Sequence, residues 1–195
     1  IKFLMFSPWR VSNAGIILTH LGVLVLLVGG LITATTQREG FLLLKEGQSG
    51  NLVSDYHARI LTIEKDGAPF VSIPFEDIES RLRKLTLPFK ITAENICRNC
   101  RPVPAPNAEG RHGLAQRVTL QDTAPDKANE ANLSGLMFRI AGAGEEQDGV
   151  YMTMEEIPHR PEITIGDVVY RIYVGRQNTE LPFAIELEDF ERELH

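Results

Sequence analysis

The sequence predicts a mainly β protein, with one transmembrane α-helix near the N-terminus followed by an extracytoplasmic β-sandwich or open-barrel domain. Two observations predict this class. Residues 11–37 contain no Asp, Glu, Lys or Arg, and beyond them the chain consists of short apolar or alternating runs separated by Gly and Pro. The first pattern is typical of a membrane span, and the second of many short strands. The predicted organisation is a cytoplasmic-side flank over 1–10, a span over 11–37 and a β domain over 38–195.

The length of the apolar segment favours a true membrane span over a cleaved signal peptide. Its apolar part covers residues 14–34, which as a helix rising 1.5 Å per residue is about 31 Å, close to the thickness of a bilayer core. The apolar region of a signal peptide is roughly 7–15 residues. Trp9 and Arg10 directly precede the segment, where interfacial anchors belong. With Lys2, Arg10 also predicts that the N-terminus is cytoplasmic.

The predicted helix carries small residues and one histidine. Gly15, Gly22 and Gly29 recur every seven residues, and such a stripe predicts close packing against other helices. His20 lies about 9 Å inside the helix start. Ionisable groups at that depth face a bundle interior, a cavity or a cofactor, and a neutral imidazole is a common iron ligand. His20 is therefore the candidate cofactor ligand, the alternative being a neutral histidine bonded to a neighbouring helix.

The segments predicted to form β structure are short, and turn signals separate them. Asp66-Gly67 predicts a hairpin turn, and a short helix is expected over 75–84. The expected strands are 41–44, 59–64, 70–75, 117–120, 136–140, 150–154, 162–165 and 168–174. Residues 101–113 and 122–134 are expected to be loops because Pro, Gly and polar residues dominate them.

Two segments of the β domain share a motif. Residues 87–91 and 181–185 both read Leu-Pro-Phe-X-Ile. In each, apolar side chains keep period two over three positions and then skip one residue, which predicts a β-bulge late in the segment. The recurrence indicates either two related β units, over 38–110 and 111–195, or chance in a β-rich chain.

The charges of the chain argue against nucleic-acid binding. All 26 Asp and Glu residues follow Gln37, whereas Lys2 and Arg10 precede it, so the β domain is acidic. Nucleic-acid affinity depends on neutralising phosphates with cations. No nucleotide-binding loop, Ser/His/Asp order or G-x-S-x-G motif occurs in the sequence. The sequence therefore predicts no catalytic residue and no metal site.

Cys97 and Cys100 form a C-x-x-C motif with three interpretations: a local disulfide, a pair that exchanges with a thiol-bearing partner, or half of a zinc site. Zinc needs two more ligands, and the sequence offers no second C-x-x-C and only His112 nearby. Arg101 stands where a covalent haem site needs His. Three prolines soon after it prevent the helix that a thioredoxin-like motif requires. The disulfide is favoured, and exchange stays open.

Three blocks in a fixed order resemble one family. The helix contains "THLGVLVLLVGG", then "REGFLLLKEGQ" follows, and "LPFAIELEDFERE" lies near the end. Together these blocks resemble the ResB (CcsB) family of cytochrome c biogenesis proteins, and the most specific parts are His20-Leu21-Gly22, Leu181-Pro182-Phe183 and Asp189-Phe190. Because members of that family have further helices and this chain starts at Ile1, we expect it to be a piece of a longer protein.

The resemblance implies a function. ResB-like proteins are membrane subunits of system II in the inner (cytoplasmic) membrane, where they act with a polytopic CcsA/ResC-type partner. The pair moves haem b across the membrane and presents it to apocytochrome c, and the chain would be a non-catalytic subunit of this haem-attachment complex. The family's helix histidine, here His20, would ligate haem among membrane lipid. The alternatives are a single-pass anchored adaptor whose β domain binds another envelope protein without a cofactor, and a redox protein using Cys97 and Cys100.

Overall fold

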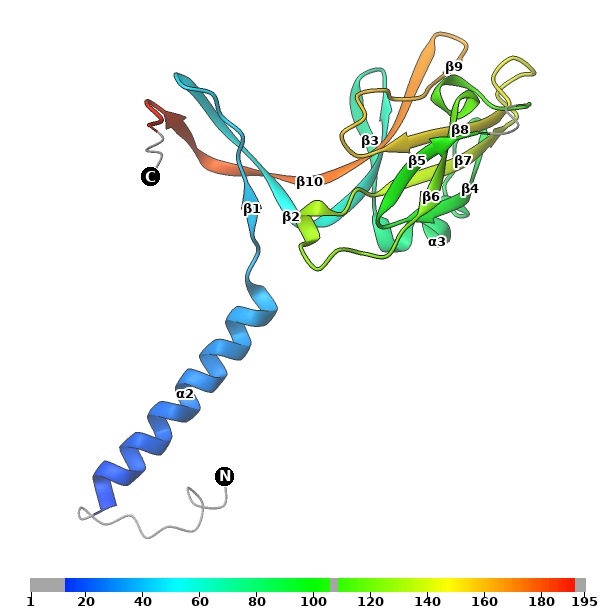
Figure 1. Ribbon diagram of the computed structural model, residues 1–195. Helices are drawn as coiled ribbons and strands as arrows, with labels where there is room; N and C mark the ends of the chain where they lie inside the picture. Colours follow the sequence, from blue (N-terminus) through cyan, green and yellow to red (C-terminus); the bar gives the residue numbers. More distant parts are fainter. Residues whose placement is uncertain (1–12, 106–108, 192–195) are drawn as a thin grey trace. The chain divides into compact units, whose positions relative to one another are not determined.

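A computed structural model describes residues 13–105 and 109–191 (Figure 1). The flank predicted over 1–10 lies outside the described residues. The chain divides into two compact units, Ile1–Glu39 and Gly40–His195. The helices and strands of the second unit, in chain order, are β1 (Gly40–Phe41), β2 (Gln48–Lys65), β3 (Ala68–Pro74), η2 (Phe75–Asp77), α3 (Ile78–Leu82), β4 (Lys90–Cys97), β5 (Cys100–Pro104), η3 (Gly113–Gln116), β6 (Val118–Asp122), η4 (Asn129–Ala131), β7 (Gly135–Ala141), β8 (Gly149–Met154), β9 (Glu162–Ile165) and β10 (Val168–Leu187).

The described part of the first unit contains the helix α2 (Ala14–Thr36), which confirms the predicted helical segment. It is long and apolar enough to cross a membrane. Its polar side chains bond to the helix backbone: the Thr36 hydroxyl donates to the Ile32 carbonyl at 2.8 Å. Such bonding satisfies hydroxyl groups where water is excluded. The helix ends at Thr36, because the next residue, Gln37, has an extended backbone.

The second unit is built from antiparallel strands, and this confirms the predicted mainly β class. Three sheets form it: a five-stranded sheet ordered β1-β2-β10-β9 with β3 also paired to β2, a three-stranded sheet ordered β4-β7-β8, and the β5–β6 pair. The sheets pack in layers with the three-stranded sheet in the middle. β8 is accordingly buried along its whole length.

The main core lies between the five-stranded and the three-stranded sheets. Alternate side chains of β7, such as Phe138, meet Ile63 of β2 and Ile172 of β10, all fully buried. The short helix η2–α3, within the predicted 75–84, adds Ile78 to this core. A second core on the other face of β7 and β8 contacts the β5–β6 pair and contains Met137, Met152, Met154, Leu120 and the two cysteines. This division follows from strand geometry, because successive side chains point to opposite faces.

Local sequence signals set two features of the register. Asp66 and Gly67 have φ of 52° and 81°, so both central turn residues adopt the positive φ that a type I′ hairpin requires. This confirms the predicted turn. In β4 the register with β7 shifts between Ala93 and Asn95, which confirms a bulge late in the first Leu-Pro-Phe segment.

Other expectations differ from the structure. The second Leu-Pro-Phe segment has its register shift between Glu180 and Ile185. The bulge therefore contains the motif, whereas the sequence predicted a bulge late in the segment. β5 crosses a stretch expected to be a loop: Pro102 and Pro104 fit there because β5 is an edge strand of its two-stranded sheet. Both main sheets combine strands from 38–110 and from 111–195, so the two stretches are interleaved in space.

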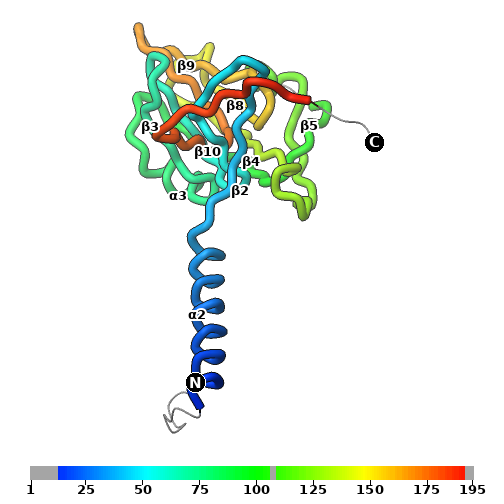
Figure 2. The backbone as a smooth tube through the Cα atoms, turned by 90° about the vertical axis from the view of Figure 1, so that its left-hand side faces the viewer, coloured from blue at the N-terminus to red at the C-terminus, as the bar shows by residue number. Residues whose placement is uncertain are grey.

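β2 and β10 are the longest strands and pair over much of their length (Figures 1 and 2). Near Lys65 and Tyr170 they belong to the main core. Beyond a register shift between Arg176 and Asn178 they continue as a two-stranded ribbon that extends away from the packed sheets (Figure 1). We call residues 42–53 and 178–191 the distal ribbon.

Candidate functional site

His20, the predicted cofactor ligand, lies on the exposed surface of α2. Its ring Nδ1 is 2.8 Å from the carbonyl oxygen of Ile16, one turn earlier. A carbonyl only accepts, so Nδ1 carries the proton and donates this bond. In the neutral ring Nε2 is then the nitrogen that bears the lone pair. Metal-bound histidines commonly show this arrangement, with one ring nitrogen donating to a carbonyl and the other ligating the metal.

The glycines of the helix leave its surface accessible to a close neighbour. A Cβ built on Gly15, Gly22 or Gly29 meets no atom within 4 Å, apart from the helix's own nearby backbone. Thr19 adds no exposed donor, because its hydroxyl bonds to the Gly15 carbonyl at 2.9 Å. His20 is about 140° around the helix from Gly15, so a helix packed on the glycines would leave the imidazole facing elsewhere.

The structure joins Cys97 and Cys100 in a disulfide. The bridge closes the end of β4 onto the start of β5, and both residues are nearly inaccessible, with exposed fractions of 1% and 5%. Gly135 of β7 packs directly against it: a Cβ there would lie 2.8 Å from the Cys100 Sγ. Cysteines held in this way are not zinc ligands, because zinc binds thiolates.

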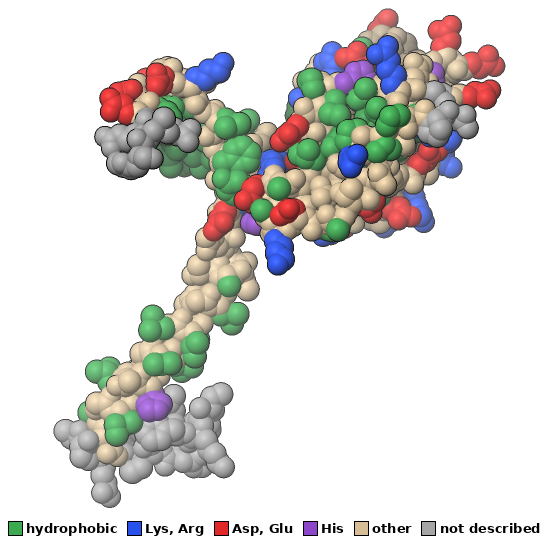
Figure 3. Space-filling view, in the orientation of Figure 1, with side chains coloured by type: hydrophobic (Ala, Val, Ile, Leu, Met, Phe, Trp, Pro, Cys, Tyr) green, Lys and Arg blue, Asp and Glu red, His purple; other side chains and the backbone are tan. Residues whose placement is uncertain are grey.

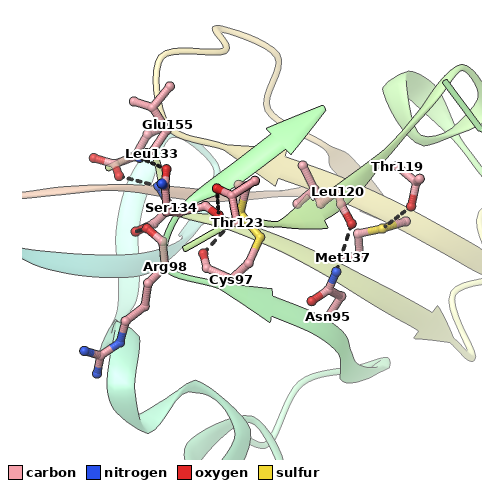
Figure 4. The surroundings of a disulfide bond; sticks show 12 residues. Asn95, Cys97, Arg98, Thr119, Leu120, Thr123, Leu133, Ser134, Met137 and Glu155 are labelled. Carbon is pink, nitrogen blue, oxygen red and sulfur yellow. Dashed lines mark hydrogen bonds between the residues drawn. A yellow bond between two sulfur atoms is a disulfide. The ribbon is translucent and has the colours of Figure 1, made fainter. Parts of the chain in front are cut away.

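Hydrogen bonds fasten the residues between and around the cysteines (Figure 4). The Cys100 N–H donates to the Leu133 carbonyl at 2.7 Å, and the Ser134 hydroxyl donates to the Arg98 carbonyl at 3.0 Å. The Thr123 hydroxyl donates to the Asn99 carbonyl at 2.9 Å. Disulfide exchange needs a thiolate to reach one sulfur, and here both sulfurs are covered, so the arrangement favours a structural bridge.

Replacing both cysteines, Cys97→Ser with Cys100→Ser, is expected to lower the free energy of unfolding by about 2 kcal/mol, because the crosslink constrains the unfolded chain only over a short loop. Urea unfolding of the detergent-solubilised chain, followed by circular dichroism, measures this loss. Dithiothreitol should reduce the bridge of the folded protein no faster than the domain opens. Complete reduction within seconds under native conditions would contradict a buried structural disulfide.

Sequence reasoning missed a buried group of charges. Glu155, which follows β8, accepts from Arg59 Nε at 3.2 Å and lies 3.4 Å from Arg176 Nε. It also accepts the Ser134 N–H at 2.7 Å. The Arg59 guanidinium donates further to the backbone carbonyls of Tyr56, His57, Asn129 and Asn132. Glu155 thus holds two cations, and Arg59 ties the 129–132 segment to β2, so the group is structural.

A second carboxylate, Glu64 of β2, is also nearly buried. It accepts from the Tyr173 hydroxyl at 2.8 Å and from Arg160 Nη1 at 3.3 Å. Burial, and then this hydrogen bond, raise the pKa of Tyr173 above its ordinary value of 10.0. The phenol therefore stays protonated at neutral pH, as a donor to Glu64 and not as a base.

The described residues contain no group of three His, Cys, Asp or Glu side chains that could hold a metal ion. His112 stacks on Tyr151 at 5.0 Å between ring centroids, and its Nε2 lies 3.0 Å from the Asp148 carbonyl.

The fold and these sites define a mainly β protein, whose described residues include one helix long and apolar enough to span a membrane. No protein-family model matches the chain, and no curated protein matches it.

Proposed function

We propose that the chain is a membrane subunit of the machinery that matures c-type cytochromes, and that His20 ligates the haem this machinery transfers. The haem is cargo, which the complex delivers to apocytochrome c. The single observation that carries the proposal is the bond from His20 Nδ1 to the Ile16 carbonyl. It gives the imidazole the tautomer, and a fixed orientation, that a haem ligand at Nε2 requires.

The location of His20 supports the same function. An ionisable side chain within an apolar helix is costly in lipid, and ligation of iron inside the membrane offsets that cost. One imidazole suffices for one axial position of haem iron. The accessible glycines on another side of the same helix are suited to packing against a polytopic partner of the CcsA/ResC type.

In this proposal the chain spans the inner (cytoplasmic) membrane once over 14–36, with the β domain on the periplasmic, or extracytoplasmic, side. The disulfide agrees with that placement, because disulfides persist in oxidising compartments and are rare in the cytosol. The part of the chain that the structure describes contributes ligation and positioning to a cytochrome c synthase complex, and covalent attachment is left to the partner.

His20→Ala is expected to abolish most of the haem Soret absorbance of the full-length protein, co-purified with its polytopic partner in detergent. Added imidazole should restore much of that band by occupying the vacated axial position. His57→Ala is the matched control, since His57 is an exposed histidine of the β domain bonded to Asn129. An unchanged Soret band in His20→Ala would remove His20 from the haem site.

A second candidate function is an anchored adaptor that binds another envelope protein without a cofactor. The observation that favours it is the distal ribbon, which exposes large apolar side chains although it is remote from both cores. The two functions are compatible, because a haem-delivery subunit must also hold other proteins. Retained binding of a partner by His20→Ala, with haem lost, would separate the two activities.

A further inference from the structure

The distal ribbon has no core of its own. None of its residues is buried, and large apolar side chains are among the most exposed of the second unit: Leu43 is 83% exposed, Phe183 59%, Leu52 51% and Ile185 44%. A two-stranded ribbon alone is marginally stable in water. Exposed apolar side chains that gather on one element mark an interaction surface, so the ribbon has the character of an incomplete interface.

Several of these side chains share one face. Ile185 pairs with Gly50, and Leu52, two residues along β2, points to the same side of the ribbon. Gly50 has no side chain to cover that face, and Leu44 Cδ2 fills part of the space, 3.1 Å from where a Cβ would stand. The result is an apolar strip of Leu44, Leu52 and Ile185.

The bulge of β10 adds a hollow of about 500 Å³, lined by Asn51, Glu180 and the residues from Leu181 to Ala184. In the hollow, Asn51 Nδ2 donates to the Glu180 carboxylate at 2.9 Å. A carboxylate beside the exposed Phe183 ring suits a Lys or Arg side chain, whose stem packs on the ring while its charged end meets the carboxylate.

The distal ribbon is strongly acidic, and its one cation is Lys45. Residues 179–191 include five carboxylates, namely Glu180, Glu186, Glu188, Asp189 and Glu191, and no Lys or Arg. No ion pair involves any of the five within the described chain. Figure 3 shows acidic side chains gathered at the far end of the ribbon beside hydrophobic ones. Such a surface attracts cationic partners, and it repels both anionic lipid and a second copy of itself.

The outer edge of β10 is available for backbone pairing. β9 pairs with β10 only over Val168–Arg171, and no strand of the described chain pairs with that edge beyond it. An extended peptide can add to such an edge through main-chain hydrogen bonds, while its alternate side chains use the surface beside it.

From these observations we propose that the distal ribbon binds an extended segment of another protein in which Lys or Arg alternates with large apolar residues. The apolar side chains of the segment cover Leu52 and Ile185, and its cations meet Glu180, Glu186 and Glu188. The inference is independent of haem binding, since it uses no residue of α2.

Fluorescence anisotropy with a labelled peptide of alternating Lys and Val tests the proposal, using the full chain in uncharged detergent at low salt. The peptide should bind, and the double variant Glu186→Lys with Glu188→Lys should weaken binding by at least about tenfold. The matched control reverses two exposed carboxylates elsewhere, Glu145→Lys with Glu146→Lys, and should leave the affinity within about twofold.

A second pair of variants tests the apolar part. Phe183→Ser should weaken binding by about tenfold, whereas Phe70→Ser, which changes an exposed phenylalanine of β3, should not. Circular dichroism of each variant should match the parent chain, which separates lost binding from lost folding.

Four results would overturn the proposal. Equal binding of a Lys-Ser peptide would show that peptide binding depends on charge alone. Equal weakening by the ribbon variants and their controls would show that the peptide is attracted by the acidic domain as a whole and not by the distal ribbon. Dimers that Phe183→Ser dissociates would assign the ribbon to a second copy. Binding to phosphatidylglycerol vesicles that depends on Phe183, without binding to the peptide, would assign it to lipid.

Discussion

Glu155→Gln is expected to lower the free energy of unfolding of the β domain by about 3–5 kcal/mol, because it leaves two guanidinium groups without their buried counter-charge. The Glu155 side chain is 3% exposed, and its oxygens face Arg59 and Arg176. Water cannot replace the lost charge at such a site. Arg59 would keep its four backbone carbonyl partners, so the variant should retain the fold and lose stability.

Urea unfolding of the full chain in detergent measures the effect as a lower midpoint with an unchanged m value. Glu162→Gln is the matched control. Glu162 pairs with Arg171 at 2.6 Å, but these side chains are 53% and 40% exposed, and surface pairs contribute about 0–1 kcal/mol. Equal losses in the two variants would show that burial does not determine the contribution of Glu155.

Local patterns were sufficient to predict much of the β domain. Short apolar or alternating runs bounded by turn residues located β7, β8 and β9. Asp66-Gly67 specified the turn between β2 and β3, since few other dipeptides accept positive φ at both positions. The uncharged stretch predicted α2, because length and apolarity are sufficient to identify a helix that can span a membrane.

Features that depend on distant partners escaped prediction. Arg59 and Glu155 look like solvent-facing charges, and only the pairing of segments 96 residues apart buries them together. The period-two spacing of Phe183, Ile185 and Leu187 indicated β structure near the end of β10, but residues 175–180 show no apolar alternation and have no buried side chain, so this middle part of β10 was not predicted. Its pairing with β2 continues by backbone hydrogen bonds, which carry no signal in side-chain type.

The same contrast between local signals and features that depend on the whole fold applies to the candidate sites. His20 was identifiable from sequence, because an imidazole in an apolar helix is unusual whatever surrounds it. Its bond to Ile16 follows directly from the four-residue spacing of a helical turn. The distal ribbon could not be identified as an interaction surface from sequence. What marks it is the exposure of its apolar side chains, and that exposure depends on what the rest of the fold covers.

Phe89 and Phe183 hold the same place in the two Leu-Pro-Phe-X-Ile segments, yet their replacement by alanine is expected to differ greatly. Phe89 is 5% exposed and packs edge-on against Tyr170 with 5.3 Å between ring centroids. Phe89→Ala should therefore cost about 3–5 kcal/mol, through lost burial and the cavity left behind. Phe183 is 59% exposed, and Phe183→Ala should change stability by no more than about 0.5 kcal/mol.

Comparing the two variants separates the effect of the shared motif from the effect of its surroundings in the fold. Urea midpoints of the two variants measure stability, and anisotropy with the Lys-Val peptide measures binding. Phe89→Ala should lower the midpoint and leave the affinity of the folded fraction unchanged, whereas Phe183→Ala should do the reverse. If Phe183→Ala instead destabilised the domain by several kcal/mol, the distal ribbon would have to be covered by the protein's own chain, and a separate partner would not be needed to explain its apolar side chains.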